Sequence, residues 1–427
     1  MHKFERLYYS DSFVTSFTGA VTDVRELGGN SGEPIWQLLL DRTTFYPTSG
    51  GQPFDTGHLS ATLRDGTALK VLVEQVEEDE QRAVWHFVRK PLAAGTHVEG
   101  RIDWERRFDH MQQHTGQHLL SAVFLRELQA ETVSFHLGES TSTIDLACGP
   151  LAHHSLERVE RIANEIIGED RPVTIRFVSR SEAEHMLDAG KLRKLPERQG
   201  EIRLIYIADC DNNACGGTHV RSTGQIGGLM VRTVERVSRG VRVEFVCGSR
   251  AIRAARMDFR ILSETAALLS TGAKELSATV GRMLTEGRAN AKERQNLREE
   301  LAMFQAAKLA MEAPIESGLR LVVHEWRDRD GDYVKLLASK TAAAAARTAV
   351  IFFANESTPV RVFVARSSDL DFNCGQILRE TLAHLRLRGG GSADLAQGEV
   401  PAEQEKALRD SLSDAIRRAV AEVHKKL

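Results

Sequence analysis

The sequence predicts an α+β protein of several domains, and three observations carry this prediction. Residues 1–95 alternate strand-like segments with polar or glycine-rich turns. The next region mixes amphipathic helices with further strands, and a proline-free stretch rich in Ala, Leu, Glu, Arg and Lys follows it. Because 427 residues are too many for one compact core, we expect four parts. Their bounds are 1–95, 96–250, 251–312 and 313–427.

Residues 1–95 are expected to form a small, barrel-like β domain. Their strand-like segments are short, and turn-forming residues separate them. The clearest segments are Trp36–Leu40, Lys70–Val73 and Val84–Val88. Short strands with such turns favour a small barrel or another all-β fold.

Residues 96–250 are expected to form an α+β domain. Within 109–128, apolar residues recur at steps of three and four, which predicts an amphipathic helix. A second helix is predicted at Leu156–Ile167 by the same spacing. Strand-like segments follow at Thr174–Val178, Ile202–Ile207, Leu229–Val234 and Val241–Val246.

Residues 251–312 are predicted to form a long helix or a helical hairpin. Their apolar residues follow a heptad seam of the coiled-coil kind: Phe259, Leu262, Ala266, Leu269, Ala273, Leu276, Val280 and Met283. We expect Gly287 to interrupt the seam, which resumes with a shifted phase at Leu297. The pattern fits a helix that forms a homodimer, and it fits equally well a helix packed on its own domain.

Residues 313–427 are predicted to form a small α/β domain, with strand-like segments at Arg320–His324 and Val360–Ala365. A helix is predicted at Gly375–Leu387, and an amphipathic tail at Gln404–Val423. Between them lies a basic, glycine-rich loop that suits a phosphate backbone and consists of Arg386, Arg388, Gly389, Gly390 and Gly391.

Composition limits the classes of protein that the chain can belong to. It is 42% hydrophobic and 27% charged, as in globular proteins, and its net charge is −3. Nucleic acid would therefore bind to local basic patches. The sequence contains neither a signal peptide nor an apolar run long enough to cross a membrane. Five scattered cysteines suit a reducing cytoplasm better than a disulfide framework.

Two paired motifs carry the strongest chemical signal. His114 and His118 stand four apart on a predicted helix, so both imidazoles project from one face. Cys215 and His219 are also four apart, in a segment ACGGTH whose glycines permit a tight turn. Three imidazoles and one thiolate form a tetrahedral set suited to Zn²⁺. Four protein ligands are typical of structural zinc, and a catalytic site opens one position, so the spacing leaves both roles open.

The same segments resemble a known family. HTGQHLL (114–120) and CGGTH (215–219) resemble the zinc motifs of the alanyl-tRNA synthetase editing domain and of its stand-alone relatives, the AlaX-type trans-editing proteins. Three further segments are similar to that family: FYPTSGGQPFDTG (45–57), VSFHLGESTSTIDL (133–146) and GGGSADLAQG (389–398), the last to its DHHA1 domain. No aminoacylation domain precedes these motifs, so we expect the long AlaX form.

The resemblance implies a zinc-dependent deacylase that removes serine or glycine from mischarged tRNA(Ala). It implies that Zn²⁺ is bound by His114, His118, Cys215 and His219. It also implies that the DHHA1-like part binds the tRNA, and that the 3′-terminal nucleotide approaches Gly50, Gly51 and Gln52. Gln117 departs from the synthetase, which often has Thr before the second histidine.

Residues around the expected pocket are candidates for selectivity and for support of the metal. Thr132, Ser134 and His136 lie on a strand that should face the pocket, and a pocket that binds the serine hydroxyl would reject alanine. Asp209 and Asp211 flank the strand end before Cys215 and are candidate partners of a ligand histidine.

Two other functions stay open. One is deacylation of another mischarged tRNA, such as a substrate of the threonyl system, whose synthetases contain a related domain. The other is a non-catalytic tRNA-binding protein whose zinc is structural. A phosphodiesterase is disfavoured, because the chain contains no DHH motif.

Overall fold

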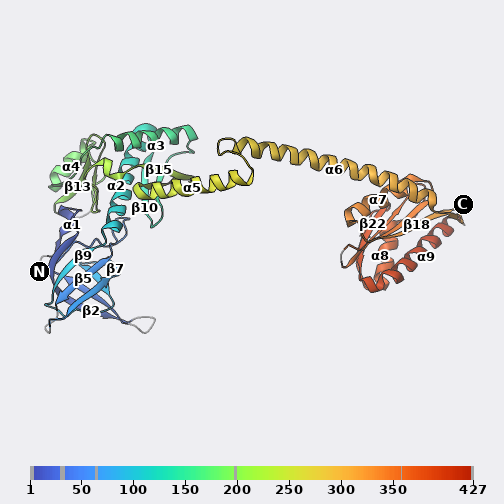
Figure 1. Ribbon diagram of the computed structural model, residues 1–427, viewed down its shortest axis with the longest axis horizontal. Helices are drawn as coiled ribbons and strands as arrows, with labels where there is room; N and C mark the ends of the chain where they lie inside the picture. The colour runs from blue at the N-terminus through green and yellow to red at the C-terminus, as the bar shows by residue number, and fades with distance from the viewer. Residues whose placement is uncertain (1–3, 29–33, 63–65, 197–199, 357, 425–427) are drawn as a thin grey trace. The chain divides into compact units, whose positions relative to one another are not determined.

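The structure is a computed structural model that describes residues 4–28, 34–62, 66–196, 200–356 and 358–424 (Figure 1). It divides into two compact units, Met1–Thr265 and Ala266–Leu427. The mixed α+β class is confirmed, whereas the four-part division of the chain stays a prediction. No helix in the described ranges combines the length and apolar character that a membrane span requires.

The first unit begins with a seven-stranded antiparallel sheet. Its strands, in order across the sheet, are β6 (Ala68–Val73), β5 (Gly57–Thr62), β9 (His97–Ile102), β2 (Ser16–Leu27), β3 (Ile35–Leu40), β8 (Val84–Val88) and β7 (Gln75–Glu78). Three short elements accompany this sheet: β1 (Glu5–Arg6), α1 (Leu7–Ser10) and β4 (Arg42–Thr43).

The expectation of a barrel is wrong, because this sheet stays open. Among the described residues, β6 pairs only with β5 and β7 only with β8. The edge strands β6 and β7 follow each other directly, with Glu74 alone between them. No ladder between β6 and β7 is present among the described residues, so the sheet does not close into a barrel.

The second half of this unit is built around α2 (Trp104–Leu128). The helix begins at Asp103, whose carboxylate accepts a hydrogen bond from the backbone N–H of Arg106. A four-stranded sheet contains β10 (Glu131–Leu137), β11 (Ser142–Ala147), β16 (Gly240–Cys247) and β15 (Leu229–Val237). A three-stranded sheet contains β12 (Val173–Val178), β13 (Ile202–Ile207) and β14 (Asp211–Ala214). The remaining elements are α3 (His153–Gly168), α4 (Arg180–Asp188) and the 3₁₀ turn η1 (Thr223–Ile226).

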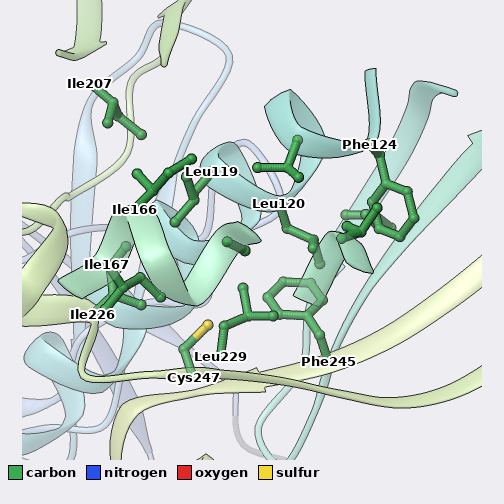
Figure 2. Packing of buried hydrophobic residues seen from close by; sticks show 14 of the residues in the cluster. Leu119, Leu120, Phe124, Ile166, Ile167, Ile207, Ile226, Leu229, Phe245 and Cys247 are labelled. Carbon is green, nitrogen blue, oxygen red and sulfur yellow. The ribbon is translucent and has the colours of Figure 1, made fainter. Parts of the chain in front are cut away.

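The core of this half surrounds the central turns of α2. Leu119, Leu120 and Phe124 pack against Ile166 and Ile167 of α3 and against the four-stranded sheet (Figure 2). Residues 110–124 of α2 are all buried. A helix that is buried on every side holds its polar side chains in fixed positions, because each of them must find an internal partner.

A buried ion pair fixes α2 to the N-terminal sheet region. The guanidinium of Arg107, in the first turns of α2, contacts the carboxylate of Asp55, and both side chains are fully buried. Arg107 also donates to the carbonyl oxygens of Ser12 (2.9 Å) and Thr44 (2.6 Å). Asp55 in turn accepts from the N–H of Tyr46 at 2.7 Å. The pair is thus satisfied on both sides, as a buried charge requires.

The predicted helical region consists of α5 (Gly248–Leu268) and α6 (Leu276–Glu312). α6 continues through Gly287, so the expected interruption concerns the apolar seam and not the helix, and it stays a prediction. The two helices are separated at residues 269–275, where Ser270 has a φ of 50° and Ser, Thr and Gly in succession disfavour a helix. Phe259, Met283 and Phe304 are exposed on these helices; homodimer formation there, or through the C-terminal part, stays a prediction.

The second unit contains a six-stranded sheet covered by helices on both faces. The strand order is β17 (Ile315–Glu316), β18 (Leu319–Trp326), β19 (Thr348–Ala354), β20 (Val360–Arg366), β22 (Leu395–Val400) and β21 (Gly389–Gly391). β18 and β19 are parallel, and α7 (Gly331–Ala344) connects them. The end of α6 packs with α7 on one face. α8 (Cys374–His384) and α9 (Glu405–His424), which follows the 3₁₀ turn η2 (Ala402–Gln404), cover the other.

Removing one partner of the buried ion pair should destabilise the first unit. We expect Asp55→Ala to lower its free energy of unfolding by about 3–5 kcal/mol, because Arg107 would remain as an unpaired buried charge. The measurement is urea unfolding followed by tryptophan fluorescence, with Trp85 and Trp104 as reporters in this unit. Replacing both partners, as in Asp55→Leu with Arg107→Met, should restore most of the loss. A loss below about 1 kcal/mol in the single variant would contradict this account.

Candidate metal centre

Four side chains predicted as metal ligands lie together in the first unit. His114 and His118 come from adjacent turns of α2, and Cys215 and His219 come from the loop after β14. Their ligand atoms all lie within 4.8 Å of one another. Sγ of Cys215 is 3.4 Å from Nε2 of His114 and 3.3 Å from Nε2 of His219. Ligands of tetrahedral zinc stand about 3.3–3.6 Å apart at its usual bond lengths, so the donor set and its spacing fit Zn²⁺.

The other ring nitrogen of each histidine has its own partner. Nδ1 of His114 lies 2.8 Å from Oε1 of Gln52, and Nδ1 of His118 lies 3.1 Å from Oδ2 of Asp211. Nδ1 of His219 lies 3.2 Å from the hydroxyl oxygen of Thr115. If each Nδ1 carries the proton and donates it, each Nε2 lone pair is free for a metal. The three imidazoles are thus oriented before any metal binds.

Neighbouring groups favour the ligand-competent thiolate form of Cys215 in spite of its burial. Burial opposes ionisation of Cys215, but His114, His219 and hydrogen bonds to the sulfur hold the pKa of the thiol well below its ordinary value. Burial alone would lower the pKa of His118, whereas Asp211 and Cys215 raise it to about 9. A metal ion must displace that proton, so its binding should weaken as pH falls.

Gln52 contacts the metal ligands through its buried side chain. Its Oε1 accepts from the N–H of Thr218, and its Nε2 donates to the hydroxyl of the same residue at 2.8 Å. Gly50 and Gly51, with φ values of 54° and 79°, form the preceding tight turn. This arrangement gives Gln52 a role in orienting His114, which sequence analysis missed although Gln52 directly follows the glycines. The predicted tRNA contact of this segment stays a prediction.

Two glycines of the motifs are required by close packing. A Cβ on Gly217 would lie 2.2 Å from Cε1 of His114, and a Cβ on Gly51 would lie 2.7 Å from the ring of Phe135. Only glycine allows the backbone to approach these rings so closely. The CGGTH loop and the turn before Gln52 can therefore both reach the metal ligands.

Of the two candidate aspartates, Asp211 and not Asp209 supports a ligand. Asp209 is exposed in a turn with a φ of 50°, and its side chain contacts none of the described metal ligands. Asp211 is buried between His118, Arg193 and Asn213. Burial would raise the pKa of Asp211, but His118 and Arg193 hold it below the ordinary value. Asp211 is the first residue of β14, where it pairs with Ile207 of β13. From this position its carboxylate reaches His118 of α2.

The strand β10 presents other residues to α2 than simple alternation predicts. A bulge between Thr132 and Ser134 shifts the register. Ser134 then pairs with Asp145, to which its hydroxyl donates at 2.8 Å, and His136 pairs with Thr143. Ser134 and His136 are exposed on the face away from α2, and their place in the substrate pocket stays a prediction.

Thr132 and Phe135 occupy the face of β10 that is turned towards α2. Phe135 pairs with buried Ile144, and its ring centroid lies 5.7 Å from that of His114. The hydroxyl of Thr132 donates to Oγ of Ser121 at 2.8 Å, and Nε2 of Gln117 donates to the same atom at 2.9 Å. Oε1 of Gln117 is buried and has no hydrogen-bond partner within the described part of the chain. Oε1 of Gln117 is thus a hydrogen-bond acceptor without a donor, one helical turn after the candidate ligand His114.

The glycine run of the second unit has a structural explanation. Gly389–Gly391 forms the edge strand β21, and α8 packs closely against it. A Cβ on Gly389 would lie 2.4 Å from Cδ1 of Leu382, and one on Gly391 would lie 2.4 Å from the carbonyl oxygen of Leu395. Arg386 and Arg388 are exposed in the preceding loop. Their predicted contact with tRNA stays a prediction.

Three family models match parts of the chain. The model of class II (A) tRNA synthetases matches residues 2–106, and the model of the threonyl and alanyl tRNA synthetase second additional domain matches residues 202–243. The DHHA1 domain matches residues 318–418. The second match contains Asp211, Cys215 and His219.

A full-length relative decides the family. The chain is 30% identical over 413 residues to the alanyl-tRNA editing protein AlaX-L of Pyrococcus horikoshii. This match covers 94% of this chain and 96% of that protein. The chain belongs to the AlaX-L family of alanyl-tRNA editing proteins. The resemblance inferred from the paired motifs is therefore confirmed.

Alanine–tRNA ligases match this chain over part of their own length. The identity is 36% over 306 residues with the ligase of Pyrococcus furiosus, which covers 69% of this chain and 31% of the ligase. The identity is 31% over 408 residues with the ligase of Pyrococcus abyssi, and this match covers 92% of this chain and 42% of that ligase. The chain thus spans less than half the length of these ligases.

Loss of the Gln52 side chain should weaken metal retention. We expect Gln52→Ala to lower the affinity for Zn²⁺ about tenfold, because His114 loses the partner of its Nδ1. The measurement is zinc competition with a chromophoric chelator at constant pH. Gln75→Ala, which removes a glutamine side chain from β7 of the N-terminal sheet, is the control. Equal affinities of both variants would show that Gln52 does not orient the ligand.

Proposed function

We propose that the chain is a trans-editing hydrolase that deacylates mischarged Ser-tRNA(Ala), with Gly-tRNA(Ala) as a second substrate. The observation that carries the proposal is the convergence of three oriented imidazoles and a thiolate in a member of the AlaX-L family. The reaction is hydrolysis of the ester between the amino acid and the terminal ribose, which yields free tRNA and the free amino acid.

His114, His118, Cys215 and His219 would hold Zn²⁺. When bound, Zn²⁺ supplies a Lewis acid that can polarise the ester carbonyl or lower the pKa of a water molecule. The chain's own contribution is orientation: Gln52, Asp211 and Thr115 hold the imidazoles through Nδ1. An aminoacyl ester is activated, so accurate positioning supplies much of the required acceleration.

Selectivity is assigned to the hydrogen-bond chain that links Thr132, Ser121 and Gln117. Its open acceptor, Oε1 of Gln117, lies one helical turn after His114. The hydroxyl of a serine ester would satisfy this buried acceptor, whereas the methyl group of alanine would leave it unpaired. An unpaired buried polar group costs about 1–3 kcal/mol, which favours hydrolysis of the serine ester.

The metal set also supports one non-catalytic alternative. Four protein ligands fill the coordination sphere of zinc, as in structural sites. In that case the chain would bind tRNA without hydrolysing its ester, and the exposed Arg386 and Arg388 would contribute to tRNA binding in both cases.

A panel of purified mischarged tRNAs tests the proposal. We expect the zinc-loaded protein to deacylate Ser-tRNA(Ala) faster than Ala-tRNA(Ala) and faster than Ser-tRNA(Thr). A chelator should abolish the activity, and added Zn²⁺ should restore it. Cys215→Ala separates the alternatives: a folded variant that binds tRNA but does not deacylate it indicates a catalytic centre. Hydrolysis of none of these tRNAs by the zinc-loaded protein would refute the proposal.

The two faces of β10 offer a matched test of selectivity. We expect Thr132→Val to reduce the preference for Ser-tRNA(Ala) over Ala-tRNA(Ala) about tenfold, because it removes one donor of the chain that holds Gln117. Ser134→Ala removes a hydroxyl from the opposite face of the same strand and should leave the preference unchanged. The ratio of kcat/KM for the two substrates is the measurement. If both variants keep the wild-type ratio, Thr132 plays no part in selectivity.

A further inference from the structure

A cluster of tyrosine and arginine side chains lies beside the metal-binding loop and has no role in the metal centre. We call Arg6, Tyr9, Glu78 and Arg82 the Tyr9–arginine cluster. A Cβ placed on Gly216, the residue after Cys215, would lie 3.5 Å from the hydroxyl oxygen of Tyr9. The cluster therefore borders the loop that carries two of the four metal ligands.

The hydrogen bonds of the cluster leave donors available. The hydroxyl of Tyr9 accepts from Arg6 at 3.3 Å and from Arg82 at 3.2 Å, so its own proton is free to donate. Arg82 uses Nε for Glu78 and Nη2 for Tyr9, and its Nη1 bonds to no other residue in the described ranges. The side chain of Arg82 is 50% exposed, whereas those of Arg6 and Glu78 are 9% and 16% exposed.

Positively charged groups outnumber negatively charged groups in and around the cluster. Glu78 forms ion pairs with both Arg6 and Arg82. A third guanidinium, that of Arg203, is 1% exposed and donates to the carbonyl oxygens of Tyr9 and Cys215. Nη2 of Arg203 has no hydrogen-bond partner in the described part of the protein. Three guanidiniums face one carboxylate and the Cys215 thiolate, and the remaining positive charge beside the metal loop favours an anion.

The backbone at Arg82 supports a function for its side chain. Arg82 has a φ of 68° in the turn between β7 and β8, a conformation that glycine adopts more easily. Non-glycine residues in this region cost free energy and are concentrated at functional sites. Here the side chain of Arg82 reaches Tyr9, and its carbonyl oxygen accepts from Arg6.

We propose that the Tyr9–arginine cluster binds the phosphodiester of the 3′-terminal adenosine of the tRNA. The inference rests on the proposed function, because that function places the aminoacyl ester at the metal centre. The ester is attached to the ribose of the terminal adenosine, so its phosphodiester must lie next to the metal loop. The Tyr9 hydroxyl and Nη1 of Arg82 donate to the phosphate oxygens, and Arg6 and Arg203 add positive charge. Such a contact holds any tRNA by its common end and leaves recognition of tRNA(Ala) to other surfaces.

The variant Arg82→Gln tests the proposal, and Arg89→Gln is its control. Arg89 follows the last residue of β8 and forms an exposed ion pair with Glu74, so the control removes one positive charge at a distance from the cluster. The two substrates are adenosine and adenosine 5′-monophosphate, each esterified with serine at the ribose. We expect Arg82→Gln to lower the preference for the phosphate-bearing substrate, measured as a ratio of kcat/KM, about fivefold. Arg89→Gln should keep the wild-type ratio. A wild-type ratio in Arg82→Gln would overturn the proposal.

Binding of an uncharged RNA hairpin that ends in CCA tests the site independently of hydrolysis. We expect the slope of log Kd against log salt concentration to fall by about 0.7 in Arg82→Gln, because one phosphate contact is lost. Tyr9→Phe, which keeps the ring and removes the hydroxyl, should weaken binding in the same direction. If the wild type hydrolyses no ester but this slope still changes, the proposed function fails and the phosphate site stands. An unchanged slope in Arg82→Gln overturns the phosphate site.

Discussion

The structure of the first unit depends on hydrogen bonds that orient three histidines, two on the buried helix α2 and one in the loop after β14. α2 places His114 and His118 one turn apart, and the loop after β14 adds Cys215 and His219. Every Nδ1 has a partner, so each imidazole can present Nε2 to a common point. Because polar side chains inside a core must be satisfied, this arrangement constrains the segments that surround the helix.

The N-terminal sheet region contributes directly to the candidate metal centre. Gln52 reaches His114 and Thr218, and the Arg107–Asp55 pair fixes the start of α2 to the same region. Tyr9 lies beside Gly216 of the metal loop. A change in the N-terminal region can therefore reach the metal ligands through direct contacts, and this region presents charged groups to the edge of the metal loop.

Sequence analysis predicted well wherever a periodic pattern or a short motif carried the information. The helix within 109–128, the strands around Ile202–Ile207 and the glycines of CGGTH all follow from local spacing. Predictions of side-chain direction were less accurate. A single extra residue in β10 turned Ser134 away from α2 and placed Phe135 there, and alternation alone cannot reveal a bulge.

The sequence by itself determined the candidate donor set: three histidines and a cysteine, paired at intervals of four, in motifs specific enough to indicate the AlaX-L family. It did so because helix geometry and the chemistry of zinc ligands are local properties. Only the tertiary structure decided which residues support those ligands. Gln52 is separated from His114 by 62 positions and Asp211 from His118 by 93, and no local pattern encodes such contacts. They arise when separate sheets pack around one helix, where burial requires each polar group to find a partner.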